Sequence, residues 1–241
     1  ILDESGELES RVNPELIESS EKLGIELHWI QANLGEIGGI PAFMRAIARS
    51  VDKQSARMVC LINNAASVAP IGPVGGSGTD APGAGSTAED TIASTIADSV
   101  GVNLIAPMVL THCFVAHFGR LACERIVINV SSGAGLSAMP GLSTYSTTKA
   151  GLNMFTTAAA TDDTSDQLIR YYAVSPGIVD TDMQATLRAA GPQRLAQHGS
   201  YTDWKENGAL VTPAEAARHV LSLLSRKDIE NGSYVHARDL Q

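Results

Sequence analysis

The sequence predicts an α/β protein built on a mostly parallel, doubly wound sheet with helices on both faces. Short apolar runs such as 57–62 and 125–131, the second rich in β-branched residues, end in small polar or turn residues, as buried strands do. Longer segments with helical patterning lie between these runs, and strands that alternate with helices form a parallel sheet joined by crossovers. The 241 residues suit one domain with a sizeable core.

The predicted elements follow the chain in order. A charged loop or fraying helix is expected at 1–12. Two segments lack a regular pattern: 72–88, rich in Gly, Pro, Ser and Thr, is expected to be a mobile surface insertion, and 185–208 is expected to be a polar, irregular loop region. Helices are expected at 14–23, 38–51, 89–118, from about 144 to 155, and at 213–224. Strands are expected at 25–34, 57–62, 125–131, 168–174 and 233–236.

Composition excludes several classes of partner. The chain has 17 basic and 26 acidic residues and a net charge of −9, which argues against binding to nucleic acid or to an anionic membrane. It has no run of about eighteen apolar residues, so no membrane span is expected. Cys60, Cys113 and Cys123 lack the spacing of metal ligands, and an odd number of cysteines favours a reducing compartment, the cytoplasm. We expect no metal site.

A phenol and an ammonium group are predicted to share one helical face. Tyr145 and Lys149 are four residues apart, so their Cβ atoms should lie about 5–6 Å apart on the helix surface. Ser132 comes directly after the strand 125–131, at the sheet edge where open α/β proteins bind ligands. A phenol acidified by a nearby positive charge can donate a proton near neutral pH. The plain alternative is an ordinary surface pair on an amphipathic helix.

Further polar motifs follow the strands in a characteristic order. Asn63-Asn64-Ala65-Ala66 follows the strand 57–62, Asn103 lies in the long helix, and Pro176-Gly177-Ile178-Val179-Asp180-Thr181 follows the strand 168–174. With Ser132 and Tyr145-x-x-x-Lys149, this series resembles the short-chain dehydrogenase/reductase family over nearly the whole chain. The run from Pro176 to Gln184 looks most like the branch of sepiapterin reductases and fungal benzil reductases. The resemblance implies a Rossmann-like fold over 1–241 and hydride transfer between NADPH and a carbonyl.

The resemblance also implies roles for the catalytic residues. Tyr145 would be the general acid that protonates the carbonyl oxygen. Lys149 would lower the pKa of Tyr145 and hold the nicotinamide ribose, and Ser132 would polarise the substrate carbonyl. Asn103 would hold a water that links Lys149 to solvent. For Asn103 the alternative is a helix irregularity beside Pro107, which the sequence explains equally well.

The remaining matched positions would bind the cofactor. Asn33 and Leu34 would lie beside the adenine, and 185–208 would shape the substrate pocket. For the motif at 63–66 the plain alternative is a polar turn that ends a strand, and for the motif at 176–181 it is a Pro-Gly turn. Ala66 stands where the family usually has glycine. The other implied cofactor residues are Asn63, Asn64 and Ala65 near the adenosine ribose, and Pro176, Gly177, Val179 and Thr181 over the nicotinamide.

The sequence departs from the family pattern at two places. No Thr-Gly-x-x-x-Gly-x-Gly turn for the pyrophosphate occurs in these residues. Either an N-terminal βαβ portion of roughly 30–50 residues is missing, which we favour, or the chain is an inactive remnant. Without the βαβ portion, the strands at 25–34 and 57–62 should have unpaired edges. His236 stands where sepiapterin reductases have an aspartate that anchors the pterin, which favours aromatic ketones or diketones over pterins.

Two functional hypotheses remain open. The first is an NADPH-dependent reductase of a small carbonyl substrate, either a pterin side chain or a benzil-like aromatic diketone. The alternative is a catalytically silent dinucleotide-binding protein that acts as a sensor or assembly partner. A homodimer is expected through the helices 89–118 and 144–155, whose apolar residues include Leu110, Phe114 and Met154; their alternative role is packing on their own sheet.

Overall fold

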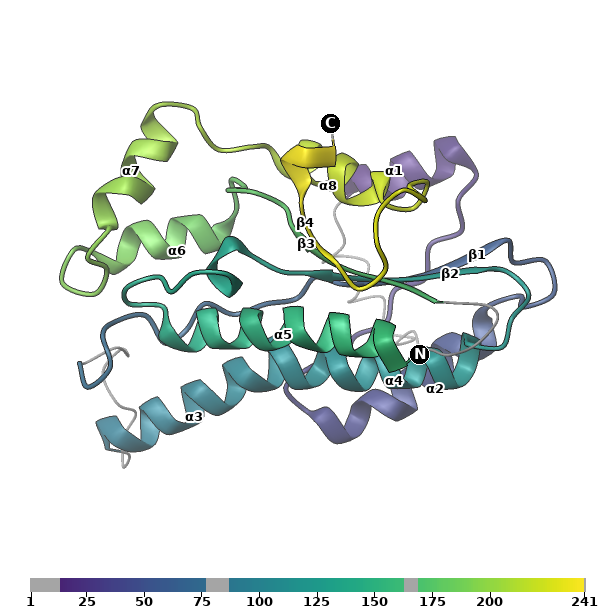
Figure 1. Ribbon diagram of the computed structural model, residues 1–241, viewed down its shortest axis with the longest axis horizontal. Coiled ribbons are helices and arrows are strands. Elements are labelled where there is room, and N and C mark those ends of the chain that lie inside the picture. Colours follow the sequence, from purple (N-terminus) through teal and green to yellow (C-terminus); the bar gives the residue numbers. More distant parts are fainter. Residues whose placement is uncertain (1–13, 77–86, 163–168, 241) are drawn as a thin grey trace.

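The chain folds into three layers around a parallel sheet (Figure 1). The computed structural model describes residues 14–76, 87–162 and 169–240. The sheet is four-stranded in the order β1-β2-β3-β4, and every neighbouring pair is parallel. This confirms the predicted fold class. The strands are β1 (Met58–Asn63), β2 (Glu124–Val130), β3 (Arg170–Ser175) and β4 (Tyr234–His236).

Helices lie on both faces of this sheet and beyond one of its ends (Figure 1). One face carries α2 (Ile40–Ser50), α3 (Ala88–Val100), α4 (Ala106–Phe118) and α5 (Ser143–Asp162). On the other side lie α1 (Pro14–Leu23) and α8 (Pro213–Ser222). The helices α6 (Asp182–Ala190) and α7 (His198–Glu206) extend past the carboxyl ends of the strands, at the left of Figure 1.

Two sequence expectations need correction, and two others, the charged loop or helix at 1–12 and most of the insertion at 72–88, lie outside the described residues. Residues 25–34 form no strand, and Ile25 and Leu27 are exposed, because the outer edge of β1 pairs with no strand in the ranges described. The region 185–208 is not irregular, since most of it lies in α6 and α7. These short helices were missed because each buries one side chain fully, Leu187 or Tyr201. Of the predicted insertion at 72–88, residues 77–86 lie outside the description.

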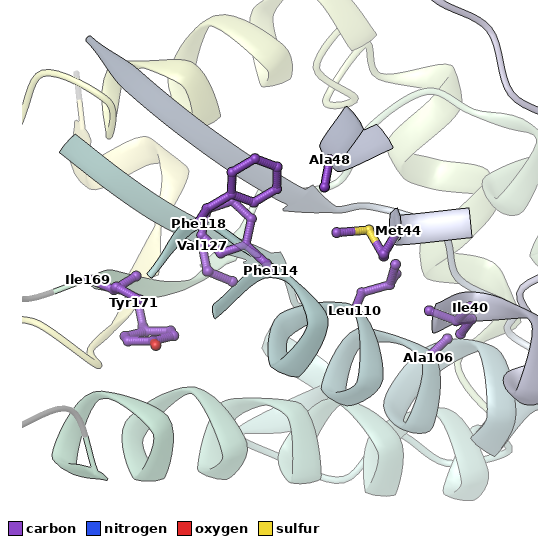
Figure 2. Close-up of a cluster of buried hydrophobic side chains, with 10 residues drawn as sticks. All are labelled: Ile40, Met44, Ala48, Ala106, Leu110, Phe114, Phe118, Val127, Ile169 and Tyr171. Atoms are coloured by element: carbon purple, nitrogen blue, oxygen red, sulfur yellow. The ribbon is translucent and has the colours of Figure 1, made fainter. Parts of the chain in front are cut away.

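The core packs on both faces of the sheet. Strand β2 alternates its side chains between the faces, as the two-residue period of a strand requires. Val127 packs against Leu110, Phe114 and Phe118 of α4 and against residues of α2 (Figure 2). Ile126 and Ile128 pack on the other face with residues of β3 and α8. Leu110 and Phe114, considered above for a dimer contact, therefore lie in the core of their own subunit.

A π-helical turn joins α3 to α4 within one continuous helix. At Gly101–Ile105 the hydrogen bonding widens, and the Ala106 N–H bonds to the Gly101 carbonyl five residues back. Pro107 is the second residue of α4, so its missing N–H falls next to the π-helical turn, where the regular hydrogen-bond pattern is already interrupted. Ala88–Phe118 is long and apolar enough to cross a membrane by length and composition. It packs against the sheet, α2 and α5, as a core helix does.

Phe114→Ala is expected to lower the free energy of unfolding by about 3–5 kcal/mol, because it removes a ring that is 2% exposed between α4 and the sheet. Met154→Ala on α5 is the matched control: that side chain is 69% exposed, so a change within about 0.5 kcal/mol is expected. Urea denaturation followed by circular dichroism measures both. Equal losses in the two variants would contradict the packing described here.

Candidate active site

A cavity of about 1080 Å³ opens at the carboxyl ends of the strands. In open α/β sheets this is the edge where ligands bind. It brings together most of the positions that the sequence singled out, although they come from segments far apart in the chain. The predicted site residues that line it are Asn64, Ala65, Ser132, Tyr145, Lys149, Pro176, Gly177, Val179 and Thr181.

Ser132 and Tyr145 meet inside this cavity. Ser132 follows the end of β2, and Tyr145 lies in the first turn of α5. Both side chains line the cavity, where the Ser132 hydroxyl is near enough to lower the pKa of Tyr145, and Tyr145 is only 9% exposed. The Ala134 N–H donates to Ser132 Oγ at 3.2 Å. Since this contact uses a lone pair of Ser132 and not its proton, the serine can still donate a hydrogen bond to an oxygen in the cavity.

Lys149 is a buried cation one helical turn after Tyr145. Its side chain is 2% exposed, and Nζ donates to the Val130 carbonyl oxygen at 2.7 Å. Nζ also lies 5.7 Å from the centroid of the Tyr145 ring, within the range of a cation–π contact. Burial lowers the pKa of Lys149 to about 8, because the charged form loses hydration.

The pKa of Tyr145 moves opposite to the sequence-based expectation. Burial raises it because a phenolate is poorly solvated in the cavity; the Ser132 hydroxyl opposes this shift, and the Tyr201 phenol adds to it. In this structure the net shift is therefore upward, against the lowering that was expected from Lys149. Tyr145 therefore keeps its proton at neutral pH, but the raised pKa makes the phenol a weaker acid than free tyrosine.

Asn103 connects the turn after β1 to the helix that carries Tyr145. It is completely buried in the π-helical turn and does not line the cavity. Its Oδ1 accepts from the Ser67 N–H at 2.7 Å, and its Nδ2 donates to the Ser67 carbonyl at 2.7 Å and to Thr148 Oγ1 at 3.2 Å. Both amide hydrogens are therefore used, and one acceptor site on Oδ1 is left for the predicted water.

Of the residues expected near the adenosine, some lie together and one does not. Leu34, Asn63, Asn64 and Ala65 line a second, mostly apolar cavity of about 260 Å³. Asn63 Nδ2 donates to Asn129 Oδ1 at 2.8 Å, but its own buried Oδ1 has no partner among the described residues. Asn33 lines neither cavity: it is exposed, and its Oδ1 accepts from the Gly35 N–H.

Sequence reasoning missed the far wall of the main cavity. Tyr201 and Trp204 of α7 line it, and their rings meet edge to face with centroids 5.2 Å apart. The two aromatic residues three positions apart were the available signal, in a segment that was expected to be irregular. His236, the last residue of β4, also lines the cavity. Other lining residues on this side are Met139, Leu142, Met183, Gln184 and Leu187.

Comparison with known proteins identifies the family. The family model for short chain dehydrogenases matches residues 9–191. A benzil reductase ((S)-benzoin forming) from Bacillus cereus is 30% identical over 226 residues, which cover 93% of this chain and 85% of that protein. A sepiapterin reductase from Xenopus tropicalis is 26% identical over 215 residues, or 88% and 75% of the two chains. A crystal structure of a short-chain dehydrogenase/reductase from Saccharomyces cerevisiae superposes with a TM-score of 0.73 at 23% identity and covers 95% and 83%.

The chain therefore belongs to the short-chain dehydrogenase/reductase family, as the sequence motifs predicted. It is an oxidoreductase with the Rossmann-like fold of that family. Members of the family bind a nicotinamide dinucleotide.

The buried ammonium of Lys149 makes stability depend on pH. Its pKa is about 8 in the folded chain and ordinarily 10.5, so between these values the unfolded chain binds a proton that the folded chain does not. Stability should therefore rise with pH in this window. Relative to Lys149→Met, the wild-type free energy of unfolding is expected to increase by about 2–3 kcal/mol from pH 8 to pH 10. Denaturant melts at intervals across this range test the prediction, and a constant difference would refute it.

Proposed function

We propose that the chain is an NADPH-dependent carbonyl reductase that transfers hydride to a ketone or diketone, of the benzil-like or pterin side-chain class. One observation carries the proposal: Ser132, Tyr145 and Lys149 line one cavity, and the Ser132 hydroxyl is near enough to Tyr145 to lower its pKa. This is a proton donor, a polarising hydrogen-bond donor and a cation in one partly desolvated volume, as carbonyl reduction requires.

The surrounding residues fit a dinucleotide. Lys149 and the segment from Pro176 to Thr181 border the main cavity at its reactive end, where they would hold the nicotinamide and its ribose. The unpaired, buried Oδ1 of Asn63 is an acceptor that a ribose hydroxyl could satisfy, and Leu34 lines the neighbouring apolar space for the adenine. Asn33 would act only through the turn that it stabilises. We propose NADPH and not NADH because of the family resemblance. Parallel turnover assays with the two cofactors test this choice.

In this mechanism the chain's own residues move the proton. The bound cofactor supplies the hydride that reaches the carbonyl carbon. As that C–H bond forms and the C=O π bond breaks, Tyr145 gives its proton to the oxygen and an alcohol results. Ser132 donates a hydrogen bond to the same oxygen while negative charge builds on it. Lys149 then stabilises the phenolate until it regains a proton, for which Asn103 would hold the relaying water.

The walls of the cavity favour an aromatic substrate. Met183, Leu187 and Trp204 form an apolar side. His236 occupies the position of the pterin-anchoring aspartate; its Nδ1 accepts from the Arg238 N–H at 3.3 Å, and burial lowers its pKa. A neutral imidazole is a weak partner for a pterin amino group. The similarity to a benzil reductase supports the same choice.

The alternative is a silent dinucleotide-binding protein. The placement of Ser132 and Tyr145 in one cavity argues against it, because a protein that only binds a dinucleotide does not need a buried proton donor. We also propose a cytoplasmic homodimer, supported by the exposed apolar side chains of Ile105, Val115 and Met154 on α3 to α5 and by free thiols at all three cysteines.

Tyr145→Phe is expected to lower kcat for benzil reduction by about 10²–10⁴-fold, because it removes the general acid and leaves the ring in place. NADPH oxidation in the absorbance assay measures turnover, and a fluorescence titration measures NADPH affinity, which should stay within about twofold.

Tyr172→Phe is the matched control, since it removes a buried tyrosine hydroxyl that is outside the cavity. Full turnover in Tyr145→Phe would contradict the proposed mechanism. NADPH binding without turnover in the wild-type chain and in both variants would support the silent binder.

A further inference from the structure

Helix α7 places a second phenol in the catalytic cavity. Tyr201 is only 2% exposed and belongs to the same buried cluster as Tyr145 and Leu142. Its ring is fixed by the edge-to-face contact with Trp204, at an interplanar angle of 79°. Tyr145 comes from α5 and Tyr201 from α7, so the two phenols approach the cavity from different elements.

The hydroxyl of Tyr201 is available to a ligand. In the part of the chain that the structure describes, it makes no hydrogen bond, and burial raises the pKa of the phenol. It is also not sealed from solvent, in contrast to the unpaired hydroxyls of Tyr172 and Tyr234. Tyr201 and Tyr145 line the same cavity, and the Tyr201 phenol contributes to the raised pKa of Tyr145. A fixed, unpaired donor in a binding cavity is a group that a substrate can satisfy.

We propose that the Tyr201 hydroxyl donates a hydrogen bond to a second substrate oxygen, on the carbon next to the carbonyl that Tyr145 protonates, and so selects aromatic 1,2-dicarbonyl compounds. The inference rests on the proposed reductase activity and deepens it. A 1,2-dicarbonyl has acceptors on adjacent carbons and can engage both phenols at once. A monoketone leaves the Tyr201 hydroxyl unpaired in a desolvated site, and sites built to bind a polar group discriminate against compounds that lack it.

The aromatic part of the substrate has a surface to pack on. Trp204, Met183 and Leu187 line the cavity on the side of Tyr201. Methionine and aromatic side chains make favourable contacts with substrate rings. A purely structural role for Tyr201, as a packing partner of Trp204, would affect all substrates alike. Substrate dependence therefore distinguishes the two roles.

The first experiment compares benzil with deoxybenzoin, which has the same skeleton with one carbonyl replaced by a methylene. In Tyr201→Phe, kcat/KM for benzil is expected to fall about tenfold, the loss of one hydrogen bond, while the value for deoxybenzoin stays within about twofold. Tyr172→Phe should change neither value. Equal losses on both ketones, or no loss on either, would overturn the inference and leave the reductase activity supported.

The second experiment measures binding without turnover. The chain has two tryptophans, Trp29 and Trp204, so in a Trp29→Phe background Trp204 is the sole indole. Quenching of its fluorescence by each ketone gives the affinity, and Tyr201→Phe should weaken benzil binding about tenfold without weakening that of deoxybenzoin.

The outcomes separate the two proposals. Tyr201-dependent quenching without turnover in any variant would contradict the reductase and support the binding role of Tyr201. If there is no quenching in the Trp29→Phe chain and no turnover in the wild-type chain, both the reductase activity and the role of Tyr201 are overturned. Circular dichroism and melting curves of each variant confirm that it is folded.

Discussion

The contact between the Lys149 ammonium and the Val130 carbonyl oxygen, at 2.7 Å, fixes the arrangement on which the active site depends. A buried cation is costly unless it is hydrogen-bonded, so this contact holds α5 against the end of β2. Two further bonds join the same elements: Ser131 Oγ donates to Asn153 Oδ1, and Asn129 Nδ2 donates to Thr156 Oγ1. Together they set the distance between Ser132, at the end of β2, and Tyr145, in the first turn of α5.

This close approach explains a glycine in the connection between the two elements. A Cβ atom at Gly135 would lie 2.8 Å from the carbonyl carbon of Lys149 and 2.7 Å from Asn153 Nδ2, closer than real Cβ contacts. Because the first contact is with backbone, a side chain there would push α5 away from the strand. The catalytic half of the cavity is thus built from fixed backbone, whereas the opposite wall comes from α6 and α7, which pack on each other beyond the sheet.

The sequence allowed the half of the candidate site that contains Ser132, Tyr145 and Lys149 to be predicted, but not the half that α6 and α7 form. Ser132, Tyr145 and Lys149 could be placed together because strand ends and helical spacing are local properties. The upward pKa shift of Tyr145 depends on burial, and the position of Tyr201 in the cavity depends on how α7 packs. Both are tertiary effects that a short stretch of sequence does not determine. Residues 25–34 alternate like a strand, but a strand forms only against a partner. Asn33, placed by analogy with the family, instead binds within its own turn.

The π-helical turn at Gly101–Ile105 determines which side of the long helix meets the sheet. One extra residue in a turn rotates the following part of a helix by about 100° relative to the preceding part. The directions of the buried Asn103 amide and of the buried Phe114 and Phe118 rings around the helix axis therefore differ from those that an unbroken α-helix would give. A deletion of one residue that restored regular α-helical hydrogen bonds could keep either Asn103 or the phenylalanine rings in their present direction, but not both. The irregularity is thus what lets a single helix form part of the apolar core and also hold the polar turn after β1.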